Sequence, residues 1–449
     1  MTAGTIEIRN PADGSVVGTV PAAGEAEIDA ALALARRTRT QWARTPAAER
    51  GALLHTAAER LRAHADELAN TNEAETGKPR DEAREGVLAG AGTLAQYAEL
   101  GPVHRGRSLL GDVGATDLMV PEPHGVVVAL TPWNDPVAVA CGLLGAALVT
   151  GNTVVHKPSE RAPHTGQLLG DVLGGVFPEG VLQTLQGDGG VGAILAMRAD
   201  VDVIAHVGST ATGRSIAASA AATGAKTLLE NGGNDPLVID EDVDPAWAAG
   251  QAALGSFANS GQICVAVERI YVCAAIAEPF LAALVKEAES RTLAPLVDRR
   301  HRDHVHSHVS DAVARGARLL TGGSVPDGAG AHYPATVLTG CAPDLRVMTE
   351  ETFGPVAPVR VVESFDQGLA EAATGDYGLA ATVLTASMAH AQRAWRELPA
   401  GTVKVNNVFG GAPGGAAHPR GRSGNGYGYG PELLDEMTQT KLVHIAPPA

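Results

Sequence analysis

From residue 125 onward, short runs of β-branched residues alternate with stretches rich in alanine, leucine and glycine, and this alternation limits the fold more than any other feature. The strand-like runs are Val126–Leu130, Thr153–His156, Val181–Leu185, Val203–Val207 and Thr227–Leu229. The helix-like stretches between them span residues 137–150, 161–173, 190–198 and 212–223. Continuous apolar strands joined by crossover helices predict a parallel sheet that is covered on both faces.

The alternation repeats in the second half of the chain, which predicts a second α/β unit. Strand-like segments Leu237–Ile239 and Ile270–Val272 flank a helix predicted over residues 244–259. Near the N-terminus, residues 25–42 and 47–70 each carry apolar side chains at helical spacing. We expect these two amphipathic helices to cover the first sheet.

Residues 105–124 and the tail 441–445 interrupt this pattern. The first segment separates the N-terminal helices from the first sheet strand, and the second is short and strand-like. Two interpretations remain open for them. They form either a protruding hairpin with an edge strand that adds to a neighbouring subunit, or an ordinary surface loop and a frayed chain end.

The composition excludes several classes of protein. Of the 449 residues, 45% are hydrophobic and 19% are charged, which is typical of a globular chain and opposite to the balance of a disordered one. The net charge is −16 and no basic cluster occurs, so we expect no nucleic-acid partner. No apolar run approaches the roughly 18 residues that a membrane span needs, and the first residues lack the pattern of a secretory signal.

The four cysteines form neither a CxxC pair nor a zinc-binding spacing; they are Cys141, Cys264, Cys273 and Cys341. In a chain of this length they do not indicate a disulfide framework, which predicts a reducing, cytoplasmic location. Cys264 lies in the segment FANSGQICVAVER. A thiolate there is suited to covalent attack on a carbonyl, although a buried structural cysteine is the commoner explanation when the residue is taken alone.

Two further polar residues follow predicted strands. Glu230 precedes the Gly232-Gly233 pair, and a partly buried carboxylate there can act as a general base with a raised pKa. Asn134 lies in the rigid turn Thr131–Pro136, and its amide can donate a hydrogen bond to a developing oxyanion. Taken singly, the glutamate could be a capping or surface acid, and the Asn-Asp-Pro turn could simply start a helix.

Two strand–helix junctions carry residues suited to a dinucleotide. Lys157 and Glu160 follow a predicted strand end, where they can bind ribose hydroxyls. The turn Gly208–Gly213 places small residues before a helix, so its free backbone N–H groups can hold a pyrophosphate. This turn is not the GxGxxG fingerprint, and glycine-rich turns of this kind also occur without ligands.

Together with EETFGPVAPV at residues 350–359, these segments resemble the aldehyde dehydrogenase superfamily in their order and over nearly the whole chain. The resemblance implies an α/β fold with two doubly wound domains and a small β oligomerisation element. The implied division is an NAD-binding domain at 1–104 and 125–231, a catalytic domain at 232–424, and an oligomerisation hairpin and tail at 105–124 and 425–449.

The resemblance also implies roles for single residues. Cys264 would be the nucleophile, Glu230 would activate the deacylating water, and the Asn134 amide with the backbone N–H of Cys264 would hold the oxyanion. The residues expected at NAD are Lys157 and Glu160 at the adenosine ribose, Ser209 and Trp133 at the pyrophosphate with Gly208 and Gly213 in the same turn, and Glu351 and Phe353 at the nicotinamide riboside.

The expected activity is the oxidation of a small aldehyde to a carboxylic acid through a thiohemiacetal and a thioester. We expect NAD rather than NADP as cofactor, no metal, and a homodimer or homotetramer. A CoA-acylating semialdehyde dehydrogenase is one alternative, but those relatives generally lack a carboxylate at the position of Glu230. A non-catalytic relative is the other, and it would not need Cys264, Glu230 and Asn134 together.

Several positions depart from the family's usual pattern. Asp135 stands where an aromatic residue is usual, and it either caps the next helix or faces the substrate tunnel, where it would favour cationic or hydroxylated aldehydes. Leu143 replaces a frequent lysine, and residues 418–424 replace a Phe-Gly-Gly stretch. The segment before Asn10-Pro11 also lacks the strand pair that many members carry.

A histidine cluster at residues 301–308 needs separate consideration. Within it, His304 and His308 have the i,i+4 spacing that could bind a metal from one helix face. No acidic or cysteine partner completes such a site, so we expect a solvated helix face for His301, His304, His306 and His308.

Overall fold

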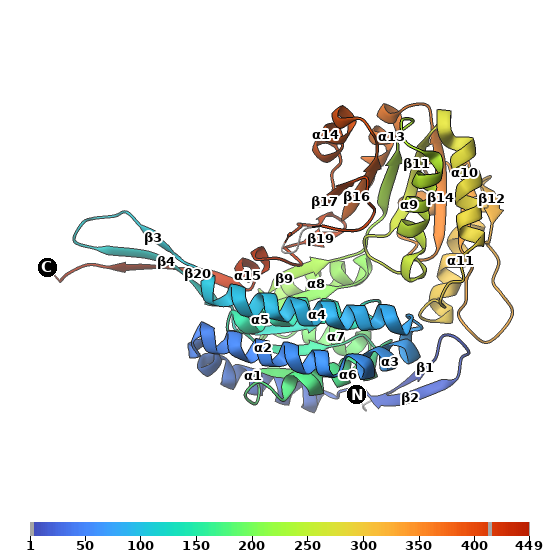
Figure 1. Ribbon diagram of the computed structural model, residues 1–449. Coiled ribbons are helices and arrows are strands. Elements are labelled where there is room, and N and C mark those ends of the chain that lie inside the picture. Colours follow the sequence, from blue (N-terminus) through green and yellow to red (C-terminus); the bar gives the residue numbers. More distant parts are fainter. Residues whose placement is uncertain (1–3, 412–414, 449) are drawn as a thin grey trace.

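Two largely parallel sheets form the centres of two lobes in the computed structural model, which describes residues 4–411 and 415–448 (Figure 1). A β arm extends away from the first lobe, at the left of the view. The predicted α/β fold class, with two doubly wound units and a small β element, is therefore confirmed.

The first sheet has the strand order β19-β9-β8-β5-β6-β7 and is parallel except for β19. Its strands are β5 (Val126–Leu130), β6 (Thr153–Lys157), β7 (Leu182–Thr184), β8 (Val203–Val207), β9 (Lys226–Glu230) and β19 (Gly424–Asn425). Every residue of β5 and β6 is buried, which explains why these strands are nearly continuous apolar runs.

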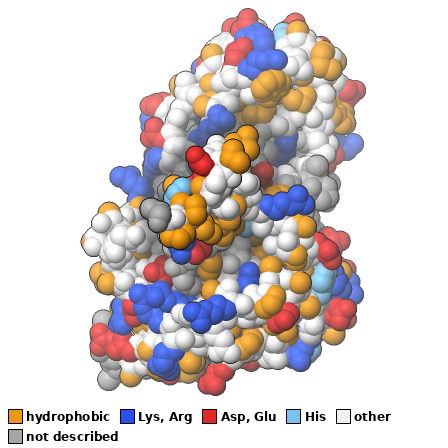
Figure 2. Space-filling view, turned by 90° about the vertical axis from the view of Figure 1, so that its left-hand side faces the viewer, with side chains coloured by type: hydrophobic (Ala, Val, Ile, Leu, Met, Phe, Trp, Pro, Cys, Tyr) orange, Lys and Arg blue, Asp and Glu red, His pale blue; other side chains and the backbone are white. Residues whose placement is uncertain are grey.

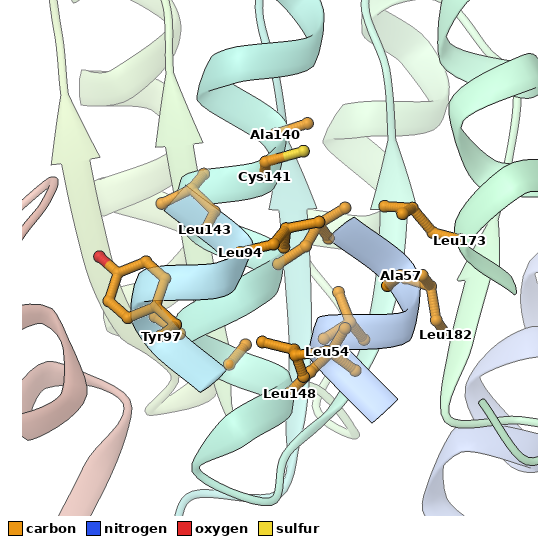
Figure 3. Packing of buried hydrophobic residues seen from close by; sticks show 14 of the residues in the cluster. Leu54, Ala57, Leu94, Tyr97, Ala140, Cys141, Leu143, Leu148, Leu173 and Leu182 are labelled. Atoms are coloured by element: carbon orange, nitrogen blue, oxygen red, sulfur yellow. The ribbon is translucent and has the colours of Figure 1, made fainter. Parts of the chain in front are cut away.

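Helices cover both faces of this sheet. One face is covered by α1 (Glu25–Arg44), α7 (Gly189–Ala196) and α8 (Thr210–Thr223). The other face is covered by α2 (Ala47–Ala63), α4 (Arg80–Leu100), α5 (Pro136–Val149) and α6 (Pro163–Gly174), with α3 (Ala65–Thr76) packed against α4 and α6. Figure 3 shows this second core, where Leu54, Leu94 and Tyr97 gather around Leu143 and Leu148 of α5.

The N-terminal helices differ from the prediction in two respects. The single helix predicted over 47–70 is wrong, because α2 ends at Ala63 and α3 begins at Ala65. Between them His64 leaves the helical conformation, with φ −102° and ψ 13°, and its ring nitrogen Nδ1 lies 2.9 Å from the carbonyl oxygen of Arg60. In addition, α4 has no counterpart among the predicted helices, because alanine and glycine form much of its buried face.

The second sheet has the order β12-β13-β14-β11-β10-β16-β17 and is parallel except for β12. Its strands are β10 (Asp235–Ile239), β11 (Val267–Cys273), β12 (Arg318–Thr321), β13 (Thr336–Thr339), β14 (Val356–Val362), β16 (Ala380–Leu384) and β17 (Thr402–Val405). On one face lie α9 (Pro245–Phe257) and α10 (Ala274–Glu289), and on the other lie α11 (Arg299–Ala314), α12 (Arg346–Thr349), α13 (Phe365–Ala372) and α14 (Met388–Glu397).

The arm consists of β3 (Arg107–Leu109), β4 (Thr116–Pro123) and β20 (Thr438–Ile445), which form an antiparallel sheet in the order β20-β4-β3. The two interrupting segments thus form a protruding hairpin with an edge strand, and the loop interpretation is wrong, while the addition of this sheet to a neighbouring subunit stays a prediction. Strand β20 covers only part of the segment 425–449 that was predicted for the arm. The rest of that segment belongs to the first lobe, because β19 pairs with β9 and the side chains of Leu433, Leu434 and Met437 are buried there.

The remaining elements are short. They are the hairpin β1 (Thr5–Arg9) and β2 (Val16–Pro21), the pair β15 (Tyr377–Gly378) and β18 (Arg420–Gly421), the helix α15 (Glu432–Glu436), and the 3₁₀ turns η1 (Gly101–Val103) and η2 (Ala258–Gly261). Within the described ranges, no helix has both the length and the apolar character that a membrane span requires.

Candidate active site

The three predicted catalytic residues meet between the two lobes. Asn134 follows β5, Glu230 ends β9, and Cys264 lies just before β11, so the carboxyl ends of the first sheet face the amino ends of the second. All three line one cavity of about 240 Å³, together with Glu351 and Phe353. The structure thus brings together residues that are up to 219 positions apart in the chain, from Asn134 to Phe353.

The predicted nucleophile and the predicted base are in contact. The sulfur of Cys264 lies 3.7 Å from Oε1 of Glu230. Burial raises the pKa of the Cys264 thiol well above its ordinary value, and the carboxylates of Glu230, Asp235 and Glu351 raise it further. Burial also raises the pKa of Glu230, although the hydrogen bond from the thiol opposes this effect. The resting pair is therefore a protonated thiol beside a potential proton acceptor.

A strained turn carries Cys264. Asn259, Ser260 and Gly261 in η2 have φ values of 46°, 55° and 74°, in the left-handed region. A β-carbon on Gly261 would lie 2.2 Å from the carbonyl oxygen of Gly354, which no side chain tolerates. This close approach packs the turn against the loop that contains Glu351 and Phe353.

Gln262 holds this turn in place. Its Oε1 accepts a hydrogen bond of 2.9 Å from the backbone N–H of Val297, and its Nε2 donates one of 3.1 Å to the carbonyl oxygen of Asn259. The backbone carbonyl of Gln262 accepts a hydrogen bond of 3.1 Å from Nδ2 of Asn134. The predicted oxyanion donor is thereby fixed to the turn that carries Cys264, at the edge of the cavity that it lines.

Asp135 is the N-cap residue of α5, but its side chain makes no capping hydrogen bond. The capping interpretation is therefore wrong. Its Oδ1 instead lies 3.4 Å from Nζ of Lys78, a lysine only 10% exposed in the connection from α3 to α4. The same Nζ lies 3.5 Å from the carbonyl oxygen of Asn134. Leu143 is buried in the core, and Lys78 places a cation beside the turn that carries Asn134.

A cleft of about 620 Å³ lies between α7 and α8 and is lined by Trp133, Lys157, Glu160, Gly208 and Ser209, all predicted at the cofactor. Ser209 is the N-cap of α8, and its Oγ accepts from the backbone N–H of Thr212 at 3.3 Å. Trp133, Gly208 and Ser209 also line the cavity around Cys264, so one continuous cleft runs from Glu160 to Cys264. An elongated ligand with an anionic centre fits this arrangement.

The predicted cofactor residues differ in what they contact. Nζ of Lys157 donates to the carbonyl oxygens of Pro158 and Gly187, at 2.7 Å and 2.6 Å, and lies 4.0 Å from Oε2 of Glu160. Gly213 lines neither part of the cleft. A β-carbon there would lie 1.9 Å from Oδ1 of Asn231, so this glycine allows α8 to pack close to Asn231.

The loop that carries Glu351 and Phe353 is held by Glu268, a residue that the sequence motifs did not indicate. Glu351 accepts a hydrogen bond of 3.0 Å at Oε1 from the backbone N–H of Gly233, and Phe353 has a left-handed φ of 53°. Both carboxylate oxygens of buried Glu268 bind this loop, because they accept the N–H groups of Thr352 and Phe353 at 2.8 Å and 2.7 Å. The sequence does contain an indication of this role, because Glu268 is a charged residue within the otherwise apolar strand segment VERIYV, and a buried charge needs a partner.

The expectation of a solvated histidine face is wrong for His301 and His308, whereas His304 is exposed as expected. His308 is fully buried, and His301 and His304 line the cavity around Cys264. Nε2 of His301 lies 2.7 Å from the carbonyl oxygen of Phe353. Burial lowers the pKa of His301 to about 4, so its ring is neutral near pH 7. The sequence could have indicated this burial. Positions 301, 305, 308 and 312 lie on one face of a helix, and the apolar residues among them show that this face packs against the protein.

In the described part of the chain, no three histidine, cysteine, aspartate or glutamate side chains are grouped in a way that could hold a metal ion.

Aromatic rings pack on one another where the two parts of the cleft meet. Trp133 lies 5.7 Å from both His301 and Phe353, measured between ring centroids, and the guanidinium of Arg161 lies 5.4 Å above the Trp133 ring. Trp133 and Arg161 line both parts of the cleft, and His301 and Phe353 line the part around Cys264.

Comparisons with known proteins show the family to which this chain is similar. The family model described as the aldehyde dehydrogenase family matches residues 1–443. Lactaldehyde dehydrogenase from Escherichia coli is 29% identical over 99% of this chain and 96% of its own, with a TM-score of 0.96. PnpE, solved in complex with nicotinamide adenine dinucleotide, is 33% identical over 99% and 95%, with a TM-score of 0.96. A variant of betaine aldehyde dehydrogenase from Staphylococcus aureus is 30% identical over 98% and 92%, with a TM-score of 0.95.

The chain belongs to the aldehyde dehydrogenase family. It is accordingly an oxidoreductase that acts on the aldehyde group of its substrate and depends on NAD or NADP. The predicted family membership is confirmed.

Proposed function

We propose that this enzyme oxidises an aldehyde to a carboxylic acid with NAD, through covalent adducts on Cys264. The observation that carries the proposal is the 3.7 Å contact between the sulfur of Cys264 and Oε1 of Glu230, inside a cavity that Asn134 also lines. A nucleophile, a proton acceptor and an amide donor therefore surround one position where an aldehyde carbon can lie.

In the first step Glu230 accepts the thiol proton, and the thiolate of Cys264 attacks the carbonyl carbon. A carbon–sulfur bond forms, and the carbonyl π electrons move to oxygen to give a thiohemiacetal oxyanion. The second N–H of Asn134 Nδ2 and the backbone N–H of Cys264 donate hydrogen bonds to this oxyanion. One such donor typically stabilises the transition state by about 3–4 kcal/mol.

In the second step the oxyanion re-forms a C=O bond, and the aldehyde hydrogen leaves the carbon with its electron pair. NAD, when bound, supplies the acceptor for that hydride. Cys264 then holds a thioester. Glu230 removes a proton from water as the water attacks this thioester, and the tetrahedral adduct expels the thiolate and releases the acid. The carboxylate of Glu230 thus accepts a proton in both half-reactions. It must therefore release the thiol proton to solvent before it activates the water.

For the cofactor we propose that Lys157 and Glu160 bind the adenosine ribose. The N-terminus of α8 at Gly208 and Ser209, with Trp133, would bind the pyrophosphate, and Glu351 and Phe353 the nicotinamide riboside. The continuous cleft from Glu160 to Cys264 supports this direction of binding. Complexes of PnpE with NAD support the choice of cofactor, and Gly213 is proposed only as a packing residue for this turn.

We propose a homodimer or homotetramer in which the arm pairs with a neighbouring subunit. Its side chains Leu110 and Leu442 are 105% and 67% exposed, which is unusual for large apolar residues in a single subunit. Figure 2 views the molecule from the side of the arm and shows hydrophobic side chains gathered at the centre of the view. A reducing, cytoplasmic location fits the cysteines, since Cys141, Cys273 and Cys341 are buried free thiols.

Transfer of the thioester to CoA is the competing reaction. A water-activating carboxylate at Glu230, in contact with the thiol, favours hydrolysis. An assay of NADH formation over a panel of aldehydes, with and without CoA, tests the proposal. Turnover with only aldehyde, NAD and water supports hydrolytic oxidation. A strict requirement for CoA would instead support transfer of the thioester to CoA. No turnover with any aldehyde would contradict both reactions.

A further inference from the structure

We infer that Glu268 is a positioning residue for the nicotinamide end of the cofactor site. It lies in β11, four residues after the nucleophile, and its side chain points to the loop at residues 350–354 rather than to the substrate cavity. The inference rests on the proposed assignment of Glu351 and Phe353 to the nicotinamide riboside.

The carboxylate of Glu268 holds two consecutive backbone groups. Its Oε2 accepts from the N–H of Thr352 at 2.8 Å, and its Oε1 accepts from the N–H of Phe353 at 2.7 Å. The residue is only 6% exposed, so water cannot replace these bonds easily. Burial raises the pKa of Glu268 to about 7, and the hydrogen bonds from Thr352 and Phe353 oppose this rise. A buried N–H that loses its acceptor is costly.

These two bonds hold a backbone conformation that Phe353 would otherwise avoid. Its φ of 53° is in the left-handed region, where a bulky aromatic residue is rarely found. Such strain persists only when the surroundings impose it, and it is concentrated at ligand sites. Nε2 of His301 at 2.7 Å from the Phe353 carbonyl oxygen adds a second support, from α11.

The loop conformation in turn places the carboxylate of Glu351. The preceding carbonyl of Glu350 accepts a 3.0 Å hydrogen bond from Nδ2 of Asn234, whose amide also lies 3.4 Å from Oε2 of Glu268. With both sides of the loop fixed, Glu351 packs against Gly232, where a β-carbon would lie 2.0 Å from its Oε2. Glu268 therefore acts on the cofactor through Glu351 and Phe353 without touching it.

The experiment compares Glu268→Gln with Asp240→Asn, a matched control. Asp240 is a buried carboxylate at the opposite end of the same sheet, where it binds the Thr385 hydroxyl at 2.7 Å. Isothermal titration of the purified apoenzyme measures the dissociation constants of NAD and of ADP, which lacks the nicotinamide riboside. Glutamine can accept only one of the two N–H groups, so we expect the Kd of NAD to rise about tenfold and that of ADP to change less than twofold.

The control should lose thermal stability while keeping the Kd of NAD within twofold. A Glu268→Gln enzyme that binds NAD as tightly as the wild type, or that loses affinity for ADP equally, would overturn the inference. Failure of the wild type to bind NAD would instead contradict the proposed function.

A second measurement does not depend on the variant folding. Hydrogen exchange in the wild-type protein should show the amides of Thr352 and Phe353 protected at least a hundredfold relative to an exposed loop, although they lie outside regular secondary structure. Exchange at the rate of an unprotected loop would show that the two bonds do not persist, and the positioning role would be excluded.

Discussion

The carboxylate of Glu230 lies 3.7 Å from the sulfur of Cys264, although 34 residues separate them in the chain. Glu230 ends β9 of the first sheet, and Cys264 precedes β11 of the second, so the contact joins the two lobes. Burial raises the pKa of both groups, and in the proposed mechanism the thiol proton passes from Cys264 to Glu230.

Replacement of Cys264 by alanine should abolish NADH formation while leaving the Kd of NAD within about twofold, because the side chain is the nucleophile and not a cofactor ligand. Steady-state assays and isothermal titration measure the two quantities. Cys341→Ala is the control, since this buried cysteine lies outside the cavity and its variant should keep most activity. Substantial turnover by Cys264→Ala would exclude the covalent mechanism.

Glu230→Gln should slow both the formation of the thioester and its hydrolysis, because the amide cannot accept a proton in either step, and rapid mixing should show at most one equivalent of NADH per site. The pH profile carries the same information. A base works in its deprotonated form, and burial raises the pKa of Glu230 above its ordinary 4.5. Wild-type kcat should therefore fall as the pH drops through that raised pKa. This acid limb should disappear in Glu230→Gln, and unchanged turnover in the variant would remove Glu230 from the mechanism.

Glu160→Ser should raise the use of NADP relative to NAD by at least tenfold in kcat/KM. The carboxylate of Glu160 would repel a 2′-phosphate, and Lys157 offers little compensation, because its Nζ already donates to two backbone carbonyls. Initial rates with both cofactors test this. Equal kcat/KM for NAD and NADP in the wild-type enzyme would contradict the assignment.

Asp135→Asn should change substrate preference with little change in stability. The side chain makes no capping bond, and a partly exposed pair with Lys78 typically contributes about 0–1 kcal/mol. Removing the carboxylate leaves the Lys78 cation unbalanced beside Asn134, so kcat/KM should rise for ω-carboxylic aldehydes relative to neutral ones and fall for cationic ones. Lys78→Met should shift both ratios the opposite way. Constant ratios in both variants would show that the pair does not face the substrate.

Gly261→Ala should destabilise the protein by at least about 2 kcal/mol and reduce kcat. The residue has a left-handed φ of 74°, and a β-carbon would lie 2.2 Å from the carbonyl oxygen of Gly354. Denaturant unfolding followed by fluorescence measures the loss. Gly250→Ala is the control, because nothing lies within 4 Å of a β-carbon there and α9 tolerates alanine well. Equal stability of both variants would contradict the close packing described.

The sequence by itself determined the α/β class and the three catalytic candidates. Buried parallel strands are largely apolar along their length, and the helices that connect them are amphipathic. The alternation from residue 125 therefore predicts the strands and helices of both sheets. The motifs around Asn134, Glu230 and Cys264 are similarly local, because a strand end, a glycine turn and a reactive side chain lie within a few residues of each other.

Only the tertiary structure decided which distant groups meet. Asp135 faces Lys78 instead of its own helix, His301 lines the cavity instead of facing solvent, and Glu268 holds a loop 84 residues further on. Each of these contacts depends on how two separate elements approach one another. From the sequence alone, the same side chain could equally well cap its own helix or face solvent. Local preferences specify the elements, whereas the geometry between elements selects the partners of each polar side chain.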